Sequence, residues 1–219
     1  GWIGDNFFGK SLLTIANFAK TLMGAGIGVG IANALKRGKL VMFSAAVAGF
    51  VGAFADKIIA LNASLTLGMC GNPIGAYVVA LFAIEIVSLY AGKTKLDILI
   101  VPLGTLVLCF AGCYLAFPFI WIIQQLGWLI SEATAITPFF MGIIISVVMG
   151  VLLTMPTSSA AIWISVASGI TDDAMLIAGG AAVVGCSCHM IGFAVASFRE
   201  NGVSGLISQG IGTSMLQIP

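Results

Sequence analysis

The chain has 219 residues, of which 60% are hydrophobic and only 8% are charged, and its mean hydropathy is +1.15. So few polar side chains cannot cover a water-soluble fold, and the composition therefore indicates a protein of the lipid bilayer. A net charge of +1 excludes a nucleic-acid-binding surface, because phosphate binding needs clustered lysine and arginine.

Apolar runs of membrane-spanning length recur along the chain, since about 20 apolar residues cross a hydrocarbon core of about 30 Å. In chain order, the expected spans are residues 11–35, 40–55, 74–92, 98–117, 138–154 and 174–196. Residues 58–70 are expected to re-enter the membrane or to lie at its surface, and 120–137 to form a surface helix. Residues 160–170 are too few to cross alone but could be half of a helix broken at Pro156. The expected fold class is all-α, a polytopic transmembrane helical protein with broken or re-entrant helices.

Basic residues between the spans predict the orientation in the membrane. The clusters at 36–39 and 93–95 should both face the cytoplasm, where lysine and arginine are enriched. Around Pro156 two layouts stay open, since residues 156–170 either complete a crossing or re-enter. Polar patches at membrane depth are tolerated where they line a cavity, which is typical of a transporter or channel rather than a simple anchor.

Glu85 is the sharpest single candidate for a functional residue. It lies about 12 Å along a helix from Lys93, at about 1.5 Å per residue, which places it near the bilayer midplane. A charge there is costly unless it is paired, protonated or hydrated. Glu85 is therefore either a substrate or proton-coupling residue or a structural hydrogen-bonding partner of another helix.

Hydroxyl groups follow Pro156 at Ser158 and Ser159. Proline removes a backbone donor, and a half-helix that begins here would direct its N–H groups and the positive end of its dipole toward a ligand. The alternative is an ordinary helix that ends at the proline and is capped by a hydroxyl. We predict that both serines contribute to the polar lining of the site.

Four other polar residues are candidates for substrate binding: Asn72, His189, Asn201 and Gln209. His189 is the only histidine, and we expect it to be neutral and to hydrogen-bond a ligand or a helix. A metal site with the neighbouring cysteines is disfavoured, because it lacks a fourth ligand and the usual spacing. Asn201 is a weaker candidate, because residues 199–202 also fit a solvated turn.

Phosphate-binding loops, dinucleotide fingerprints, nucleophile elbows and zinc-protease helices are not found in the sequence. We therefore expect no self-contained catalytic centre, no cofactor and no metal.

Several segments taken together resemble the second EIIC family of the bacterial phosphotransferase system, which includes putative perfringolysin toxin regulator-like proteins. They are residues 71–77, 91–97, 185–202 and 209–217. The resemblance implies one transmembrane domain over residues 1–219, a multi-pass permease of the bacterial cytoplasmic (inner) membrane that binds a sugar. It also implies a separate cytosolic EIIB-type phosphodonor. Members of the family extend beyond both ends of this sequence, so the chain is expected to be part of a longer protein. At the position of His189, members usually carry a polar amide.

The function expected from these observations is that of the membrane component of a sugar phosphotransferase-type transporter, and at most the membrane subunit of an enzyme. Two alternatives stay open: a membrane sensor with a permease fold, and an ion-coupled carrier in which Glu85 exchanges protons. Trp163 or Phe193 could stack on a sugar ring or simply face lipid. Glycines of the first span would suit a homodimer interface or packing within one subunit.

Overall fold

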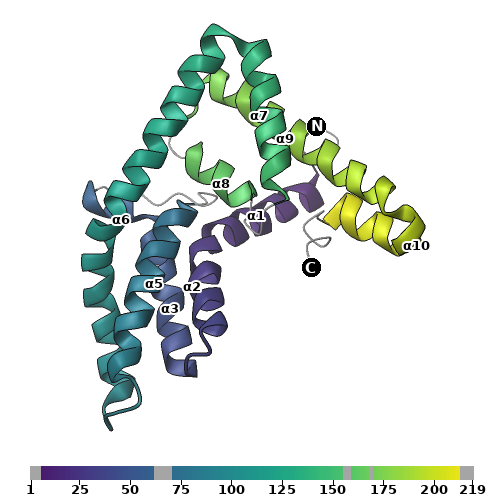
Figure 1. Ribbon diagram of the computed structural model, residues 1–219. Helices are drawn as coiled ribbons and strands as arrows, with labels where there is room; N and C mark the ends of the chain where they lie inside the picture. The colour runs from purple at the N-terminus through teal and green to yellow at the C-terminus, as the bar shows by residue number, and fades with distance from the viewer. Residues whose placement is uncertain (1–5, 62–70, 155–158, 168–169, 213–219) are drawn as a thin grey trace. The chain divides into compact units, whose positions relative to one another are not determined.

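The computed structural model describes residues 6–61, 71–154, 159–167 and 170–212, and this part of the chain is helical without a strand (Figure 1). The α-helices are α1 (Phe7–Thr21), α2 (Met23–Ala34), α3 (Lys39–Ala53), α4 (Ala55–Ile59), α5 (Pro73–Tyr90), α6 (Asp97–Ile136), α7 (Pro138–Leu152), α8 (Ser159–Val166), α9 (Asp173–Ala196) and α10 (Phe198–Ile207). A short π-helix, η1 (Ser208–Gly212), follows α10. They form two compact units, residues 1–123 and 124–219, whose boundary falls within α6.

Three of the described helices are long and apolar enough to cross a membrane, namely α5, α6 and α9. A fourth crossing is added if α1 and α2, which are bent by 49° at Leu22, count as one broken span. The all-α fold with broken helices is thus confirmed, and the bent pair occupies the first expected span. Helices α3 and α7 lie where spans were expected, but each has only 15 residues.

Helix α6 differs from the expectation of a span that ends near Phe117 and a separate surface helix over 120–137. The structure has one helix of 40 residues that contains Pro102 and Pro118. A proline costs a helix one internal hydrogen bond and adds a steric clash, but neighbouring structure often re-satisfies the freed carbonyl in membrane helices. Pro118 therefore does not end the helix.

The first unit is held together by close backbone contacts between α2, α3 and α5, which lie side by side in Figure 1. A Cβ atom added at Gly24 would lie 2.6 Å from the carbonyl oxygen of Gly49, and one added at Gly28 would overlap the carbonyl oxygen of Ala45. Small residues are needed at such contacts, because they let helix backbones approach closely. Buried side chains of α5 and α6, among them Ile84 and Ile120, complete this core.

The second unit is built around the packing of α7 against α9, where Gly185 meets the backbone of Ser146. Its core contains Ile145, Met149 and Met175. Helix α8 has only eight residues, and α10 and η1 pack against the end of α9.

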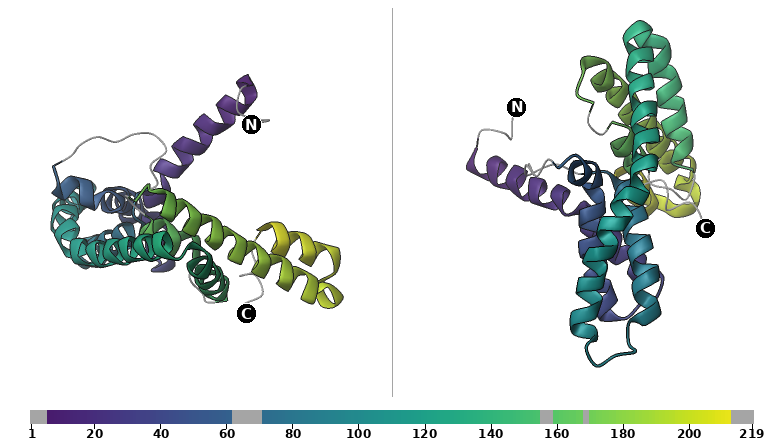
Figure 2. Two further views of the ribbon diagram at one scale, coloured as in Figure 1. Left: turned by 90° about the horizontal axis from the view of Figure 1, so that it is seen from above. Right: turned by 90° about the vertical axis from the view of Figure 1, so that its left-hand side faces the viewer.

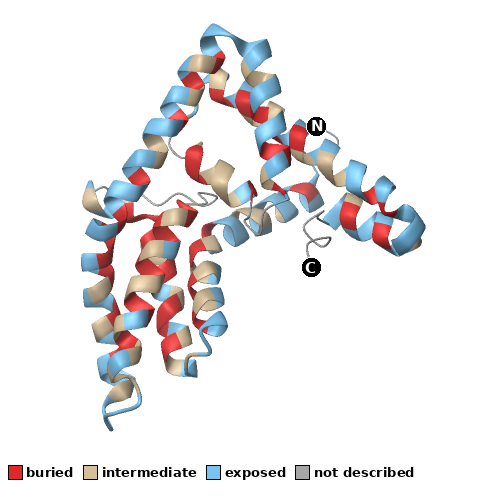
Figure 3. Cartoon of the chain, in the orientation of Figure 1, coloured by how far each residue is buried: buried red, intermediate tan, exposed pale blue. Residues whose placement is uncertain are grey.

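Exposed residues, pale blue in Figure 3, run along the helices of both units, and many of them are large and apolar. Phe43, Val107 and Phe139 are each more than 70% exposed. Apolar surface of this extent is rare on soluble monomers and is covered here by lipid or protein. The exposed surface therefore agrees with a multi-pass membrane protein.

Candidate functional site

A cavity of about 400 Å³ lies within the second unit, bounded by α7, α8, α9 and η1. This volume falls in the range of small-molecule sites, which are mostly apolar with a few placed polar groups. Its lining residues are Met149, Leu153, Ser159, Ala160, Trp163, Ile164, Ala182, Val183, Cys186, Ser187, Met190 and Gly212. The polar groups among them are the hydroxyls of Ser159 and Ser187, the thiol of Cys186 and the indole N–H of Trp163.

Ser159, the first residue of α8, is buried in the wall of this cavity. Its Oγ lies 3.9 Å from the Sγ of Cys186, and that thiol donates to the carbonyl oxygen of Met149 at 3.9 Å. A hydroxyl both donates and accepts hydrogen bonds, so the Ser159 side chain can bond a ligand as well as the thiol.

Trp163 and Ser187 complete the polar part of the wall. The indole of Trp163, one turn along α8 from Ser159, lies over Gly179 of α9, where an added Cβ atom would be 3.7 Å from its Nε1. A glycine at this position lets the half-buried ring lie close to the α9 backbone. Ser187 follows Cys186 on α9 and is exposed. The cavity thus combines an aromatic ring with hydroxyls from two helices.

His189 lies on α9 next to Met190, which lines the cavity, but His189 itself does not line it. Its ring packs on Phe193 with the ring centroids 4.4 Å apart, and its Cβ is directed toward Gly150 of α7. Phe193, one of the two candidate aromatic platforms, is thus a partner of His189 in the structure. Of these two aromatic residues, Trp163 is the one that lines the cavity.

The remaining candidates of the second unit lie apart from the cavity wall or outside the described residues. Gln209 is buried in η1 and accepts a hydrogen bond of 2.9 Å from the hydroxyl of Ser197. This bond ties η1 to the end of α9, and η1 in turn contributes Gly212 to the cavity. Asn201 is exposed on α10, just before a kink at Gly202. Ser158 lies outside the described residues.

Asn72 is a structural element of the first unit, where it caps the N-terminus of α5. Its Oδ1 accepts hydrogen bonds from the backbone N–H groups of Ile74 at 2.9 Å and Gly75 at 3.2 Å. The backbone N–H of Asn72 donates to the carbonyl oxygen of Ala53 at 2.7 Å. The side chain is 1% exposed, and among the described residues its Nδ2 has no acceptor. A buried donor without a partner is rare in proteins and asks for an explanation.

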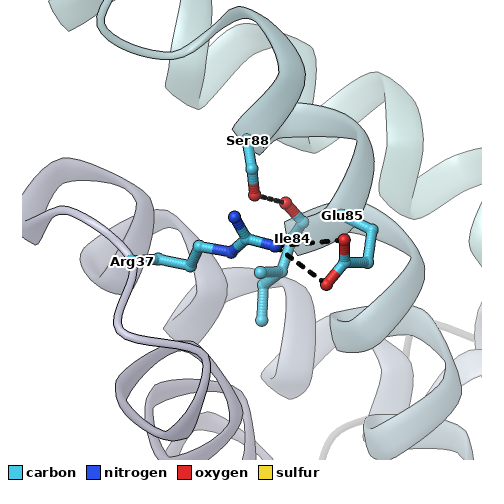
Figure 4. Close-up of polar contacts among 4 residues, drawn as sticks. All are labelled: Arg37, Ile84, Glu85 and Ser88. Atoms are coloured by element: carbon cyan, nitrogen blue, oxygen red, sulfur yellow. Dashed lines mark hydrogen bonds and ion pairs between the residues drawn. The ribbon is translucent and has the colours of Figure 1, made fainter.

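Glu85 pairs with Arg37, which lies in the turn between α2 and α3 (Figure 4). One guanidinium nitrogen lies 3.1 Å from each carboxylate oxygen of Glu85, and the two side chains are 33% and 49% exposed, respectively. One turn further along α5, the hydroxyl of Ser88 donates to the carbonyl oxygen of Ile84. The pair gives Glu85 a structural partner that was not identified in the sequence.

The reach of the arginine side chain is the signal that could have revealed this pair. Arg37 lies just beyond the end of α2, and Glu85 lies five residues before the end of α5. If both helices end on the same side of the membrane, a long side chain spans the difference in depth. Cys186 and Ser187 were missed in the cavity because they lie within an apolar run.

The comparisons with known proteins rest on one result. The family model described as "Phosphotransferase system, EIIC" matches residues 1–219. No curated protein and no solved structure matches the chain.

Proposed function

Because this chain belongs to the EIIC family of the phosphotransferase system, we propose that it is the membrane permease component of a sugar phosphotransferase system. In this proposal it binds a carbohydrate and moves it across the bacterial cytoplasmic membrane. A separate cytosolic EIIB-type protein supplies the phosphoryl group. The chain's own part is to bind the sugar and to orient the hydroxyl that is phosphorylated.

The cavity of the second unit is the observation that supports this proposal best. A sugar ring offers an apolar face and a rim of hydroxyls, each of which donates and accepts hydrogen bonds. The indole of Trp163 would cover the apolar face, and Ser159 and Ser187 would meet hydroxyls at the rim. The Ser159 hydroxyl is buried in the cavity wall and lies 3.9 Å from the Cys186 sulfur.

In this proposal Asn72 is assigned a role in ligand binding and Glu85 a structural one. The unpaired Nδ2 of Asn72 supports a role as a donor to a ligand oxygen in the first unit. The contact of Glu85 with Arg37 favours the interpretation of Glu85 as a structural partner, because a charge-assisted hydrogen bond already engages both carboxylate oxygens. We therefore do not assign proton exchange to Glu85.

The test is sugar uptake into proteoliposomes that contain the full chain, with and without a phosphorylated EIIB fraction inside. We expect labelled phospho-sugar to accumulate only when the donor is present. Uptake of unmodified sugar without the donor would overturn the proposal in favour of an ion-coupled carrier. Stabilisation by a sugar without uptake under either condition would overturn it in favour of a sensor.

Two serines of α8 provide a matched pair of variants for the same assay. Ser159→Ala should reduce uptake about tenfold, since a hydrogen bond to a ligand contributes about 1 to 1.5 kcal/mol. Ser165→Ala is the control, because Ser165 is buried on the same helix, and among the described residues its hydroxyl donates only to the carbonyl oxygen of Ala161 on that helix, 2.9 Å away. Equal uptake by the two variants would remove Ser159 from the site.

Asn72→Ser separates the two roles of Asn72. Serine is about as good an N-cap as asparagine, but it lacks the amide donor. We expect the variant to unfold at a similar temperature and to bind sugar more weakly. Unchanged binding would show that Asn72 acts as a cap only.

A further inference from the structure

Two turns of the first unit carry its most concentrated positive charge. Lys36 and Lys39 lie at the turn between α2 and α3, and Lys93 and Lys95 lie at the turn between α5 and α6. Figures 1 and 2 show the two turns at the same end of this unit. All four lysines are exposed. We call this set of four lysines the basic end.

The carboxylates near the basic end are engaged by other groups. Asp97 accepts hydrogen bonds from the backbone N–H groups of Gly92 and Thr94 and from the hydroxyl of Thr94, and so closes the turn between α5 and α6. Glu85 is held by Arg37. In the described part of the chain, none of the four lysines is within ion-pair distance of an acidic group. Their charges are available to a partner outside the chain.

Exposed apolar side chains border the same lysines. Leu35 comes directly before the first basic turn, and Leu89 lies shortly before the second. Leu96 and Ile98 follow the second turn, and the four side chains are between 38% and 79% exposed. A lysine that follows a lipid-facing leucine places its ammonium group where the hydrocarbon layer ends. The anionic groups at that depth are the phosphates of lipid headgroups.

We propose that the basic end binds the phosphate groups of anionic lipids. Lysines near a membrane surface are attracted to anionic headgroups, and clusters of four or more at the end of a membrane helix are typical of such sites. Because the four lysines come from two turns, one set of headgroups would contact both helical hairpins. Lipid binding would then hold α2, α3, α5 and the start of α6 at one depth.

The test measures the affinity of spin-labelled phosphatidylglycerol and of spin-labelled phosphatidylcholine for the full chain in bilayer nanodiscs. We expect phosphatidylglycerol to be preferred at least threefold, and the preference to fall as salt is raised, because salt screens exposed charges. Each of the double variants K36Q/K39Q and K93Q/K95Q should lower the preference to less than half.

A matched control removes the same charge elsewhere. K10Q/K20Q takes two exposed lysines from α1 and should leave the preference unchanged. An equal loss in this control would overturn the proposal, because it would show a response to net charge alone. The proposal is also overturned if 10 mM inorganic phosphate abolishes the preference, which would indicate a soluble phosphate ligand. The absence of any preference for phosphatidylglycerol in the wild-type chain would likewise overturn it.

Discussion

At the scale of single residues, several polar side chains in this chain have a structural role at the end of a helix. Asn72 caps α5 and Asp172 caps α9. Asp97, the first residue of α6, closes the turn between α5 and α6. A helix end in an apolar environment leaves N–H groups that water cannot reach, so a capping side chain is worth more there. The sequence analysis took Asn72 only as a candidate for substrate binding, although its place before a proline, which suits the first helical position, also indicates a cap.

Asp172 lies just before the membrane span of α9 and provides a pH-dependent contact. Its carboxylate accepts hydrogen bonds from the hydroxyl of Ser131 and from the backbone N–H of Met175 at 3.1 Å. The Ser131 hydroxyl, with a further contribution from backbone N–H groups, holds the pKa of Asp172 below its ordinary value of 3.8. A lowered pKa means that the ionised form is favoured in the folded state.

The stability contributed by the ionised form of Asp172 is therefore present above pH 4 and is lost as the pH falls through the lowered pKa. We expect Asp172→Asn to be less stable than the wild type at neutral pH, with the difference shrinking below about pH 4. Thermal unfolding of both proteins in lipid micelles between pH 3 and pH 7 measures this difference. A gap that stays constant over the whole range would show that the charge of Asp172 contributes nothing.

At the scale of helices, periodicity and glycine content predicted where elements lie better than where they end. The glycine pairs of the first span were recognised, but the break at Leu22 was not, because neither glycine nor proline stands at that position. The opposite error occurred in α6, where a span was predicted to end near Phe117, just before Pro118, and the helix continues to Ile136. Backbone hydrogen bonding without competing water makes a proline in a membrane helix a weaker stop signal than the same residue in water.

Two glycines that lie two residues apart on α2, Gly26 and Gly28, test how tightly α2 packs on α3. A Cβ atom at Gly28 would overlap the carbonyl oxygen of Ala45, a backbone atom that cannot move without shifting α3, whereas a Cβ atom at Gly26 meets no atom within 4 Å. Gly28→Ala should therefore destabilise the protein by about 1 to 3 kcal/mol. Gly26→Ala should change stability by less than about 1 kcal/mol, in the stabilising direction.

Reversible unfolding in mixed micelles compares these two variants directly. Both replace glycine by alanine on the same helix, so the intrinsic helix preference is the same and only the packing differs. A loss of stability in Gly28→Ala alone would then confirm Gly28 as a contact within one subunit. A loss of stability in Gly26→Ala instead would indicate that the open glycine face packs against another copy of the chain.

At the scale of the whole molecule, the sequence predicted the class of protein, the family and the order of apolar segments, while the pairing of polar groups emerged only from the structure. The cavity illustrates the difference: Ser159 was recognised because it follows a proline, but Cys186 looked like packing within an apolar run. Contacts such as that of Arg37 with Glu85 join residues 48 positions apart, and no local pattern records which side chains meet. The described helices of full spanning length are also fewer than the apolar runs, because α3 and α7 are short.

The orientation of the first unit in the membrane yields a prediction that depends on the fold of the unit. Figure 1 shows the turn after α2 and the turn after α5 at the same end, so both should reach the same side of the bilayer, and their lysines predict the cytoplasmic side. In a cysteine-free background, Lys36→Cys and Lys95→Cys should each react with a membrane-impermeant maleimide in inside-out vesicles and not in right-side-out ones. Val107→Cys is the control, because Val107 is 71% exposed in the middle of an apolar helix stretch and should face lipid, where the reagent does not reach. Labelling of the two lysine positions from opposite sides would contradict both the shared end of the two turns and the basic end built on it.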